Sequence, residues 1–192
     1  MRVETVTLRA TVADHTKGPK DALPQVAFAG RSNVGKSSLL NSLFGTRLAA
    51  VSKTPGKTRT INYYLVNQRW YFVDLPGYGY ARTAREQRQE WGRNVTTYLQ
   101  EESRLQLVVG LVDPRIPTSP LDVDLVGFVR AAGKPLLLVM TKTDRMGRGA
   151  LAQATLRLSR ELAGGEQPVA FSAPDGTGRK EILAAIAQTL AA

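Results

Sequence analysis

The stretch "GRSNVGKSS" at residues 30–38 follows the apolar run "QVAFA" and leads into "LLNSLF". Its glycines, lysine and serine match the P-loop pattern GxxxxGK[ST], in which backbone N–H groups and a helix N-terminus surround phosphate oxygens. The apolar run before it predicts a buried strand, and the leucine spacing after it predicts a helix over Lys36–Phe44. The stretch therefore predicts a strand, a phosphate-binding loop and a helix in succession.

The P-loop pattern gives roles to individual residues. Lys36 is expected to reach the β- and γ-phosphates as a catalytic residue, and Ser37 is expected to be a ligand of Mg²⁺. A glycine-rich turn that binds nothing is the alternative, but the flanking strand and helix favour a nucleotide site. The loop residues expected to contact the nucleotide are Gly30, Arg31, Ser32, Asn33, Val34, Gly35, Lys36 and Ser37.

The rest of the chain alternates strand-like and helix-like segments. The runs at 61–66 and 70–75, separated at Asn67 and Gln68, predict an antiparallel hairpin. This alternation predicts a three-layer α/β P-loop NTPase fold, with a mostly parallel six-stranded sheet, one antiparallel edge hairpin and helices on both faces. Residues 23–192 are expected to form this single domain, and residues 1–22 an N-terminal arm or an extra edge strand. Further strands are predicted over 105–112, 135–140 and 168–173, and helices over 86–102, 121–131, 151–163 and 180–190.

The composition excludes several classes of protein. The 192 residues contain no cysteine, which excludes a disulfide framework and a thiolate metal site. The first residues show no signal-peptide pattern and the apolar runs are too short to span a bilayer, so a cytoplasmic protein without membrane insertion is expected. The net charge of +10 favours a polyanionic partner such as nucleic acid, although a merely basic, soluble surface is the alternative.

The sequence "TKTD" at 141–144 follows a predicted strand and is typical of a guanine-recognition loop. The Asp144 carboxylate can accept hydrogen bonds from both N1–H and the 2-amino group of guanine, whereas adenine would leave it unpaired. Lys142 can lay its aliphatic stem along the base. The sequence "FSA" at 171–173 can offer a backbone N–H to the guanine oxygen. The residues expected at the base are Thr141, Lys142, Thr143, Asp144, Phe171, Ser172 and Ala173.

Two further segments are predicted to sense the γ-phosphate. In "DLPG" at 74–77, the carboxylate of Asp74 would hold Mg²⁺ through a water and the N–H of Gly77 would meet the γ-phosphate. The polar segment at 53–60 should add a threonine to the Mg²⁺ ligands, and spacing alone does not choose among Thr54, Thr58 and Thr60. Loss of the γ-phosphate would release both segments, as in a nucleotide-dependent switch. The contacts expected from the first segment are Asp74, Leu75, Pro76 and Gly77.

Five segments of the chain carry a family resemblance: "GRSNVGKSSLLNSL", "SKTPGKTRTINYYLV", "VDLPGYGYA", "TKTD" and "FSA". Together they closely resemble the EngB (YihA/YsxC) family of bacterial GTPases, in the TrmE–Era–EngA–EngB–Septin-like group. The resemblance implies a Ras-like G domain that binds GTP and GDP with Mg²⁺ and hydrolyses GTP. It also implies that Thr58 is a catalytic residue and a ligand of Mg²⁺. The switch I residues that it implies for the nucleotide are Gly56, Lys57, Thr58, Arg59 and Thr60.

The same resemblance implies a role in assembly of the large ribosomal subunit and, in some bacteria, in normal cell division and septation. The expected partner is the large ribosomal subunit or its precursor, through rRNA and ribosomal proteins, and the protein is expected to be a monomer. One alternative is a nucleotide-gated binder of a division or membrane partner, with hydrolysis only as a reset. Another is a P-loop kinase, which would carry an arginine-bearing lid and prefer ATP.

Three residues modify what the resemblance implies. Tyr78 stands where Ras-like GTPases have the glutamine that orients the attacking water, so slow intrinsic hydrolysis is expected. Thr141 stands where many GTPases have asparagine, so a modest nucleotide affinity is expected. In related GTPases an asparagine at the position of Asn33 helps to hold K⁺ beside the phosphates, so Asn33 is a candidate catalytic residue and K⁺ a candidate cofactor. The alternative, that Asn33 only stabilises the loop, stays open.

The basic segment after "DLPG" combines arginine with aromatic residues. Such a face would suit RNA contact beside a switch, whereas an ordinary solvated helix face is the alternative. Its arginines are Arg82, Arg85, Arg88 and Arg93. His15, the only histidine, has no metal-like companions and is expected in a surface loop. Three carboxylates are assigned no chemistry: Asp113, Asp122 and Asp124.

Overall fold

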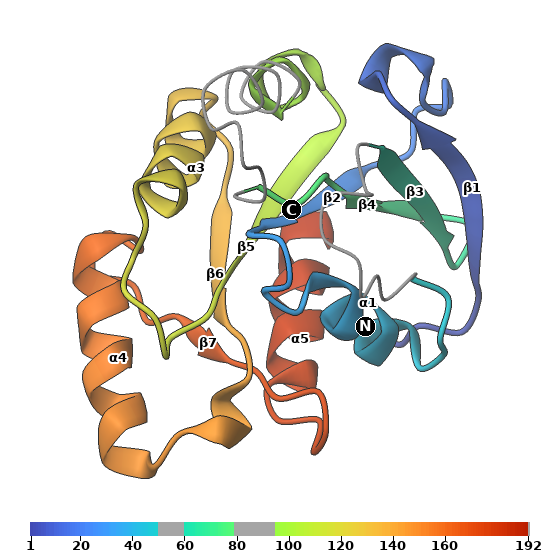
Figure 1. The fold of residues 1–192 in the computed structure, drawn as a ribbon. Coiled ribbons are helices and arrows are strands. Elements are labelled where there is room, and N and C mark those ends of the chain that lie inside the picture. Colours follow the sequence, from blue (N-terminus) through green and yellow to red (C-terminus); the bar gives the residue numbers. More distant parts are fainter. Residues whose placement is uncertain (50–59, 79–94, 192) are drawn as a thin grey trace.

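A seven-stranded sheet forms the centre of the computed structural model, which describes residues 1–49, 60–78 and 95–191 (Figure 1). The strand order across the sheet is β1-β3-β4-β2-β5-β6-β7. Strand β3 runs antiparallel to both of its neighbours, and the other neighbouring pairs are parallel. The strands are β1 (Val6–Val12), β2 (Gln25–Gly30), β3 (Ile61–Val66), β4 (Trp70–Asp74), β5 (Leu105–Val112), β6 (Leu136–Met140) and β7 (Val169–Ala170).

Helices cover both faces of this sheet. Helices α1 and α5 pack on one face, and α3 packs with the helical residues 95–101 on the other. Helix α4 contributes Leu158 to a third apolar cluster, together with Val126 of α3 and Met140 of β6. The α-helices are α1 (Lys36–Phe44), α3 (Pro120–Ala131), α4 (Arg148–Glu161) and α5 (Arg179–Ala191), and the short 3-10 helices are η1 (His15–Lys17) and η2 (Thr143–Arg145). In the part of the chain that the structure describes, no helix has the length and apolarity needed to cross a bilayer.

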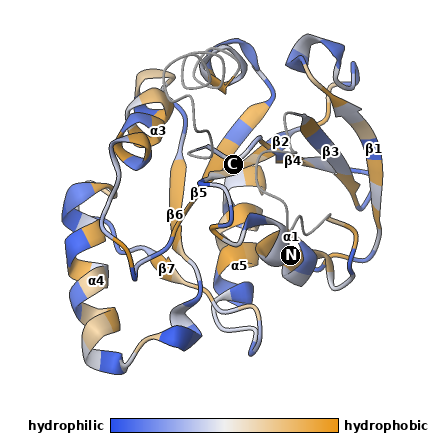
Figure 2. Cartoon of the chain, viewed as in Figure 1, coloured by the Kyte–Doolittle hydropathy of each residue, from blue (hydrophilic) through white to orange (hydrophobic). Residues whose placement is uncertain are grey.

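Two apolar layers hold the helices against the sheet. Along β2, Val26 and Phe28 belong to the layer under α1 and α5, whereas Ala27 and Ala29 belong to the layer under α3. All four side chains are fully buried, as the alternation of a strand buried on both faces requires. Figure 2 shows the same organisation, with hydrophobic residues along β6 and much of α5. The buried central strands fix the carboxyl ends of β2, β4, β5, β6 and β7 at one end of the sheet.

The predicted fold class is confirmed, with one strand more than the six that the sequence indicated. Residues 6–12 form the extra edge strand β1, in register with β3 from Val6 opposite Val66 to Val12 opposite Ile61. The hairpin of β3 and β4 therefore lies one strand inside the edge. The alternation of β1 is interrupted by a register shift between Leu8 and Ala10, and its edge position leaves Leu8 48% exposed. Because its side chains do not alternate regularly between apolar and polar, such an edge strand is only weakly indicated by its sequence.

The predicted helices and strands agree with the structure except at some ends. Helix α1 has the predicted bounds, whereas α4 begins at Arg148, three residues before the predicted start at 151. The last strand was predicted over 168–173, but only Val169–Ala170 pairs with β6. Of the helix predicted over 86–102, residues 95–101 are helical, and its first part lies outside the described residues.

Candidate nucleotide-binding site

The P-loop joins β2 to α1 at the carboxyl end of the parallel strands. Its backbone enters the left-handed region at Asn33, with φ 62°, and at Gly35, with φ 115°. The second value favours glycine, because a side chain there would be strained. Lys36, the first residue of α1, is 9% exposed, and its ammonium contacts the Asp74 carboxylate at the end of β4. Ser37 follows in the first turn of α1, so three predicted contacts with phosphate and metal lie close together.

Tyr78, the residue directly after "DLPG", is bound to the P-loop by backbone hydrogen bonds. The N–H of Ser32 donates to the carbonyl oxygen of Tyr78 at 2.7 Å, and the N–H of Tyr78 donates to the carbonyl oxygen of Gly30 at 3.3 Å. Gly77 allows this close approach, because a Cβ there would lie 3.1 Å from the Cα of Ser32. The segment predicted to sense the γ-phosphate and the loop predicted to bind it are therefore direct neighbours.

The "TKTD" loop is also hydrogen-bonded to the P-loop. Thr141 is 1% exposed, and its hydroxyl lies 2.6 Å from the carbonyl oxygen of Val34 and 3.2 Å from that of Val112. Lys142, with φ 58°, donates from Nζ to the carbonyl oxygen of Asn33 at 2.7 Å. These contacts fix the predicted base loop relative to the phosphate loop. The modest affinity expected from Thr141 stays a prediction.

The "FSA" segment lies beside "TKTD". The N–H and the hydroxyl of Thr143 both donate to the carbonyl oxygen of Phe171, at 3.3 Å and 3.1 Å. The N–H of Ser172 donates to the carbonyl oxygen of Thr177 at 3.1 Å and is therefore engaged within the chain. The backbone contact with the guanine oxygen stays a prediction, and the exposed Ala173 is the candidate for it.

Asp113, which was assigned no chemistry from its sequence position, is a neighbour of Lys142. It follows β5 and is 8% exposed. Its carboxylate accepts hydrogen bonds from Lys142 Nζ at 3.1 Å and from the Arg115 guanidinium at 2.9 Å and 2.7 Å. Burial raises the pKa of Asp113, but the hydrogen bonds from Arg115 and Lys142 outweigh it and lower the pKa to about 2. One sequence feature could have indicated that Asp113 belongs to the site. It directly follows a predicted parallel strand, and ligand sites form at the carboxyl ends of such strands.

Tyr78 and Asp122 form a second pair that sequence reasoning missed. The Tyr78 hydroxyl donates to Asp122 Oδ1 at 2.8 Å, and the two residues are 3% and 5% exposed. Asp122 Oδ2 accepts from the N–H and the hydroxyl of Ser119, both at 2.8 Å, and so caps helix α3. Burial, and next the Asp122 charge, raise the pKa of Tyr78, which keeps its hydroxyl a neutral donor. Local spacing could not connect residues 44 positions apart.

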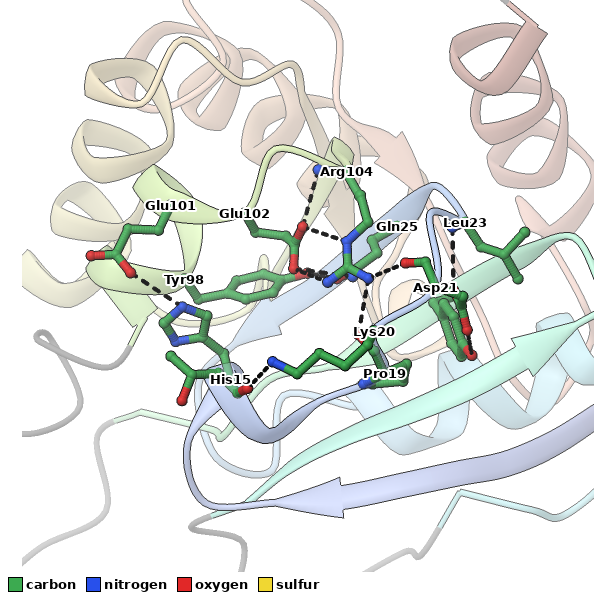
Figure 3. A network of polar contacts seen from close by, with 12 residues as sticks. His15, Pro19, Lys20, Asp21, Leu23, Gln25, Tyr98, Glu101, Glu102 and Arg104 are labelled. Carbon is green, nitrogen blue, oxygen red and sulfur yellow. Dashed lines mark hydrogen bonds and ion pairs between the residues drawn. The ribbon is translucent and has the colours of Figure 1, made fainter.

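A second polar network lies at the opposite end of the strands, where β2 and β5 begin (Figure 3). Arg104 donates to the Glu102 carboxylate at 2.7 Å and 2.6 Å, and to the carbonyl oxygen of Pro19 at 2.9 Å. The fully buried Gln25 donates to Glu102 at 3.2 Å and accepts from the Tyr98 hydroxyl at 2.8 Å. Burial raises the pKa of Glu102, but the hydrogen bonds from Arg104 reverse the shift and the pKa is lowered. No residue predicted to bind nucleotide belongs to this network.

His15 belongs to the same region, and its assignment to a surface loop was wrong. It begins η1, and its side chain is 11% exposed. Its ring packs edge-on against the ring of Tyr98, with centroids 6.0 Å apart, and its Nε2 lies 3.5 Å from the Glu101 carboxylate. The sequence offered no signal, because the packing partner lies far away along the chain. Among the residues described, no group of three or more His, Cys, Asp or Glu side chains could hold a metal ion.

The predicted site residues that the structure describes lie at one end of the sheet. They comprise residues 30–37, 74–77, 141–144 and 171–173, joined by the hydrogen bonds given above. Thr60 lies directly before β3. The other switch I residues and the basic segment lie outside the described residues, so their roles stay predictions: Thr54, Gly56, Lys57, Thr58, Arg59, Arg82, Arg85, Arg88 and Arg93.

Comparison with known proteins identifies the family. A protein family described as 50S ribosome-binding GTPase matches residues 25–142. The probable GTP-binding protein EngB of Syntrophomonas wolfei is 41% identical over 191 residues, which cover 99% of each chain. The chain belongs to the EngB family. The EngB of Thermotoga maritima is 49% identical over 144 residues, which cover 75% of this chain and 72% of its relative. As an EngB protein, the chain is a GTPase that binds GTP and GDP.

Solved structures show the same fold. A probable GTP-binding protein EngB has a TM-score of 0.73 at 22% identity, covering 86% of this chain and 98% of the other. Era, crystallised with MgGDPNP and nucleotides of 16S ribosomal RNA, has a TM-score of 0.66 at 22% identity. The match covers 87% of this EngB chain and 56% of Era. At these identities the likeness shows the shared G-domain fold.

Proposed function

We propose that this EngB GTPase is a nucleotide-controlled switch that acts in the cytoplasm, as a monomer, on the large ribosomal subunit or its precursor. The observation that carries the proposal is the pair of backbone hydrogen bonds between the P-loop and Tyr78, directly after "DLPG". A segment that touches the phosphate loop can change its conformation with the nucleotide state. The description of the matching family as 50S ribosome-binding, and the net charge of +10, support a partner that contains rRNA.

The residues around Lys36 fit a nucleotide with Mg²⁺. The contact between Lys36 and Asp74 shows that an ammonium and a carboxylate reach the same point beside the P-loop. Serine, threonine and carboxylate oxygens are ligands that suit Mg²⁺. Ser37 and Thr58 would bind the ion directly and Asp74 through a water. The bound ion would offset charge on the β- and γ-phosphates, to which Lys36 adds a second positive charge.

The position of the Tyr78 side chain supports the expectation that intrinsic GTP hydrolysis is slow. Its hydroxyl is bound to Asp122 on α3 and therefore does not replace a glutamine that orients water. We expect K⁺, held with the help of Asn33, to raise the rate of GTP hydrolysis, because a cation beside the phosphates offsets the charge that develops there. Turnover measured in matched KCl and NaCl buffers tests this. Equal rates in the two salts would leave Asn33 with a structural role only.

The proposed partner is tested by co-sedimentation with purified large and small ribosomal subunits. The protein is added with a non-hydrolysable GTP analogue, with GDP, or without nucleotide, over a series of salt concentrations. Binding to the large subunit that requires the triphosphate supports the proposal. Binding that ignores the nucleotide and weakens with salt equally for both subunits would contradict it, because that is how nonspecific attraction to a polyanion behaves. A nucleotide-gated binder of a division or membrane partner would then be the better proposal.

A further inference from the structure

Lys142 is held by two acceptors from different parts of the chain. It lies between β6 and η2, with its backbone in the left-handed region at φ 58°. Its ammonium donates to the carbonyl oxygen of Asn33 at 2.7 Å and to Asp113 Oδ2 at 3.1 Å. A lysine ammonium is a compact charge on a flexible stem, so its position depends on the acceptors that surround it. Here one acceptor is neutral and one is a carboxylate.

The Asp113 carboxylate is itself rigidly held. Its side chain is 6% exposed, and both of its oxygens accept from Arg115, from Nε at 2.9 Å and from Nη2 at 2.7 Å. The backbone N–H of Arg115 adds a third hydrogen bond at 3.2 Å. A two-pronged guanidinium contact of this kind fixes the plane of a carboxylate. Asp113 therefore presents its Oδ2 to the Lys142 ammonium in one fixed orientation.

This arrangement matters for the base, if Lys142 lays its stem along guanine as the "TKTD" motif predicts. The two acceptors hold the end of that stem beside the P-loop, so the four-carbon chain is ordered before the base arrives. Ordering a long side chain in advance lowers the entropy cost of binding. Without Asp113, the ammonium would keep only the neutral carbonyl of Asn33 and would sample more positions.

We propose that Asp113 is a positioning residue for guanine nucleotides, acting through the ammonium of Lys142. Arg115 holds both oxygens of the Asp113 carboxylate, so the chain Arg115–Asp113–Lys142 would connect the loop after β5 to the base. The proposal deepens the nucleotide site described above and rests on the assignment of Lys142 to the base. Nothing in "TKTD" itself indicates it, because the carboxylate is supplied by a different loop.

The test is a double-mutant cycle on the full chain, with Asp113→Asn, Lys142→Met and the two combined. Methionine keeps an apolar stem but removes the ammonium. Asp124→Asn is the matched control, since Asp124 is an exposed aspartate on α3 that takes no part in the site. Dissociation rates of a fluorescent mant-GDP are measured well below the melting temperature of each variant. We expect Asp113→Asn to release mant-GDP roughly tenfold faster in the native background and to have little further effect beside Lys142→Met.

The outcomes distinguish a failure of the Asp113 proposal from a failure of the base-site assignment on which it rests. Asp144→Asn serves as the check of the site, because its carboxylate is the predicted contact with guanine. If Asp144→Asn binds mant-GDP as tightly as the native chain, the assignment of the base site fails. If that variant loses binding while Asp113→Asn releases the nucleotide at the native rate, the inference alone fails. An effect of Asp113→Asn that persists beside Lys142→Met would show a merely structural role and would also overturn it.

Discussion

The two ends of the parallel strands carry polar networks of different kinds. At the beginning of β2 and β5, Arg104 and Gln25 satisfy the buried Glu102 within the chain, and Tyr98 completes the set. At the carboxyl ends, the charged groups Lys36, Asp74, Asp113 and Lys142 come from four separate loops or element ends. The first network joins the N-terminal segment and a helix end to the sheet. The second joins the segments that are predicted to meet one nucleotide.

The difference follows from the geometry of a parallel sheet. Loops that leave the carboxyl ends of neighbouring strands diverge to the two faces, and the space between them accepts a ligand. At the other end, several polar side chains are buried away from the predicted nucleotide site, so they pair with one another. We therefore expect substitutions of the residues predicted to contact guanine to change nucleotide binding more than stability. Substitutions in the network at the other end should do the reverse.

The largest expected effect is at the carboxyl end. Asp144→Asn should weaken GDP binding by at least about 100-fold, because two hydrogen bonds from guanine to a carboxylate are lost. The melting temperature should change little, since the Asp144 side chain is 25% exposed and its partner Arg145 lies at 3.9 Å. Titration calorimetry with GDP and a thermal melt of the free protein measure the two quantities. A large loss of stability with unchanged affinity for GDP would contradict the expected difference between the two ends of the strands.

The second-largest effect is expected at the opposite end of the strands, where β2 and β5 begin. Arg104→Ala should lower the free energy of unfolding by about 2 kcal/mol, because Glu102 would stay buried without its cation. The affinity for GDP should stay within about twofold, since Arg104 lies at the far end of the strands. Urea denaturation compares this variant with the matched control Arg160→Ala, whose arginine is exposed on α4. Equal stability of the two variants would argue against a structural role for the network.

A smaller effect concerns the pH dependence of stability at Asp113. The pKa of about 2 in the folded protein lies below the value of roughly 4 in an unfolded chain. The ionised carboxylate therefore raises the free energy of unfolding above about pH 4, and this contribution is lost as the pH falls toward 2. The stability difference between the native chain and Asp113→Asn should shrink across this window. Urea midpoints at several pH values measure it, and a difference that stays constant would contradict the pairing of Asp113 with Arg115 and Lys142.

The smallest effect is expected at Tyr78, next to the phosphate loop but bonded to α3. Tyr78→Phe should cost about 1 kcal/mol of stability, because one buried hydrogen bond to Asp122 is lost. Intrinsic GTP hydrolysis should stay within about twofold of the native rate if the hydroxyl has no part in the reaction. Single-turnover hydrolysis and urea denaturation measure both. A rate that falls about tenfold would show that the hydroxyl acts in catalysis.

The sequence predicts the candidate site most directly where one short segment carries its own chemistry. The P-loop, "DLPG", "TKTD" and "FSA" each follow a strand, and a parallel sheet brings the carboxyl ends of its strands together. The predictions were incomplete where the partner comes from elsewhere in the chain. Asp113 looked like an isolated carboxylate because its contact with Lys142 spans 29 positions. His15 was assigned to the surface because its contact with Tyr98 depends on how the N-terminal segment folds back.

The sequence by itself determined the order of the elements, the P-loop and the choice of guanine, because these depend on residue types at short spacing. Only the tertiary structure decided that residues 6–12 extend the sheet as β1 and that Tyr78 turns to Asp122. It also decided that the N–H of Ser172 is engaged by Thr177. The physical reason is the same in each case. A hydrogen bond between distant segments depends on their relative position in space, and that position is set by packing against the common core.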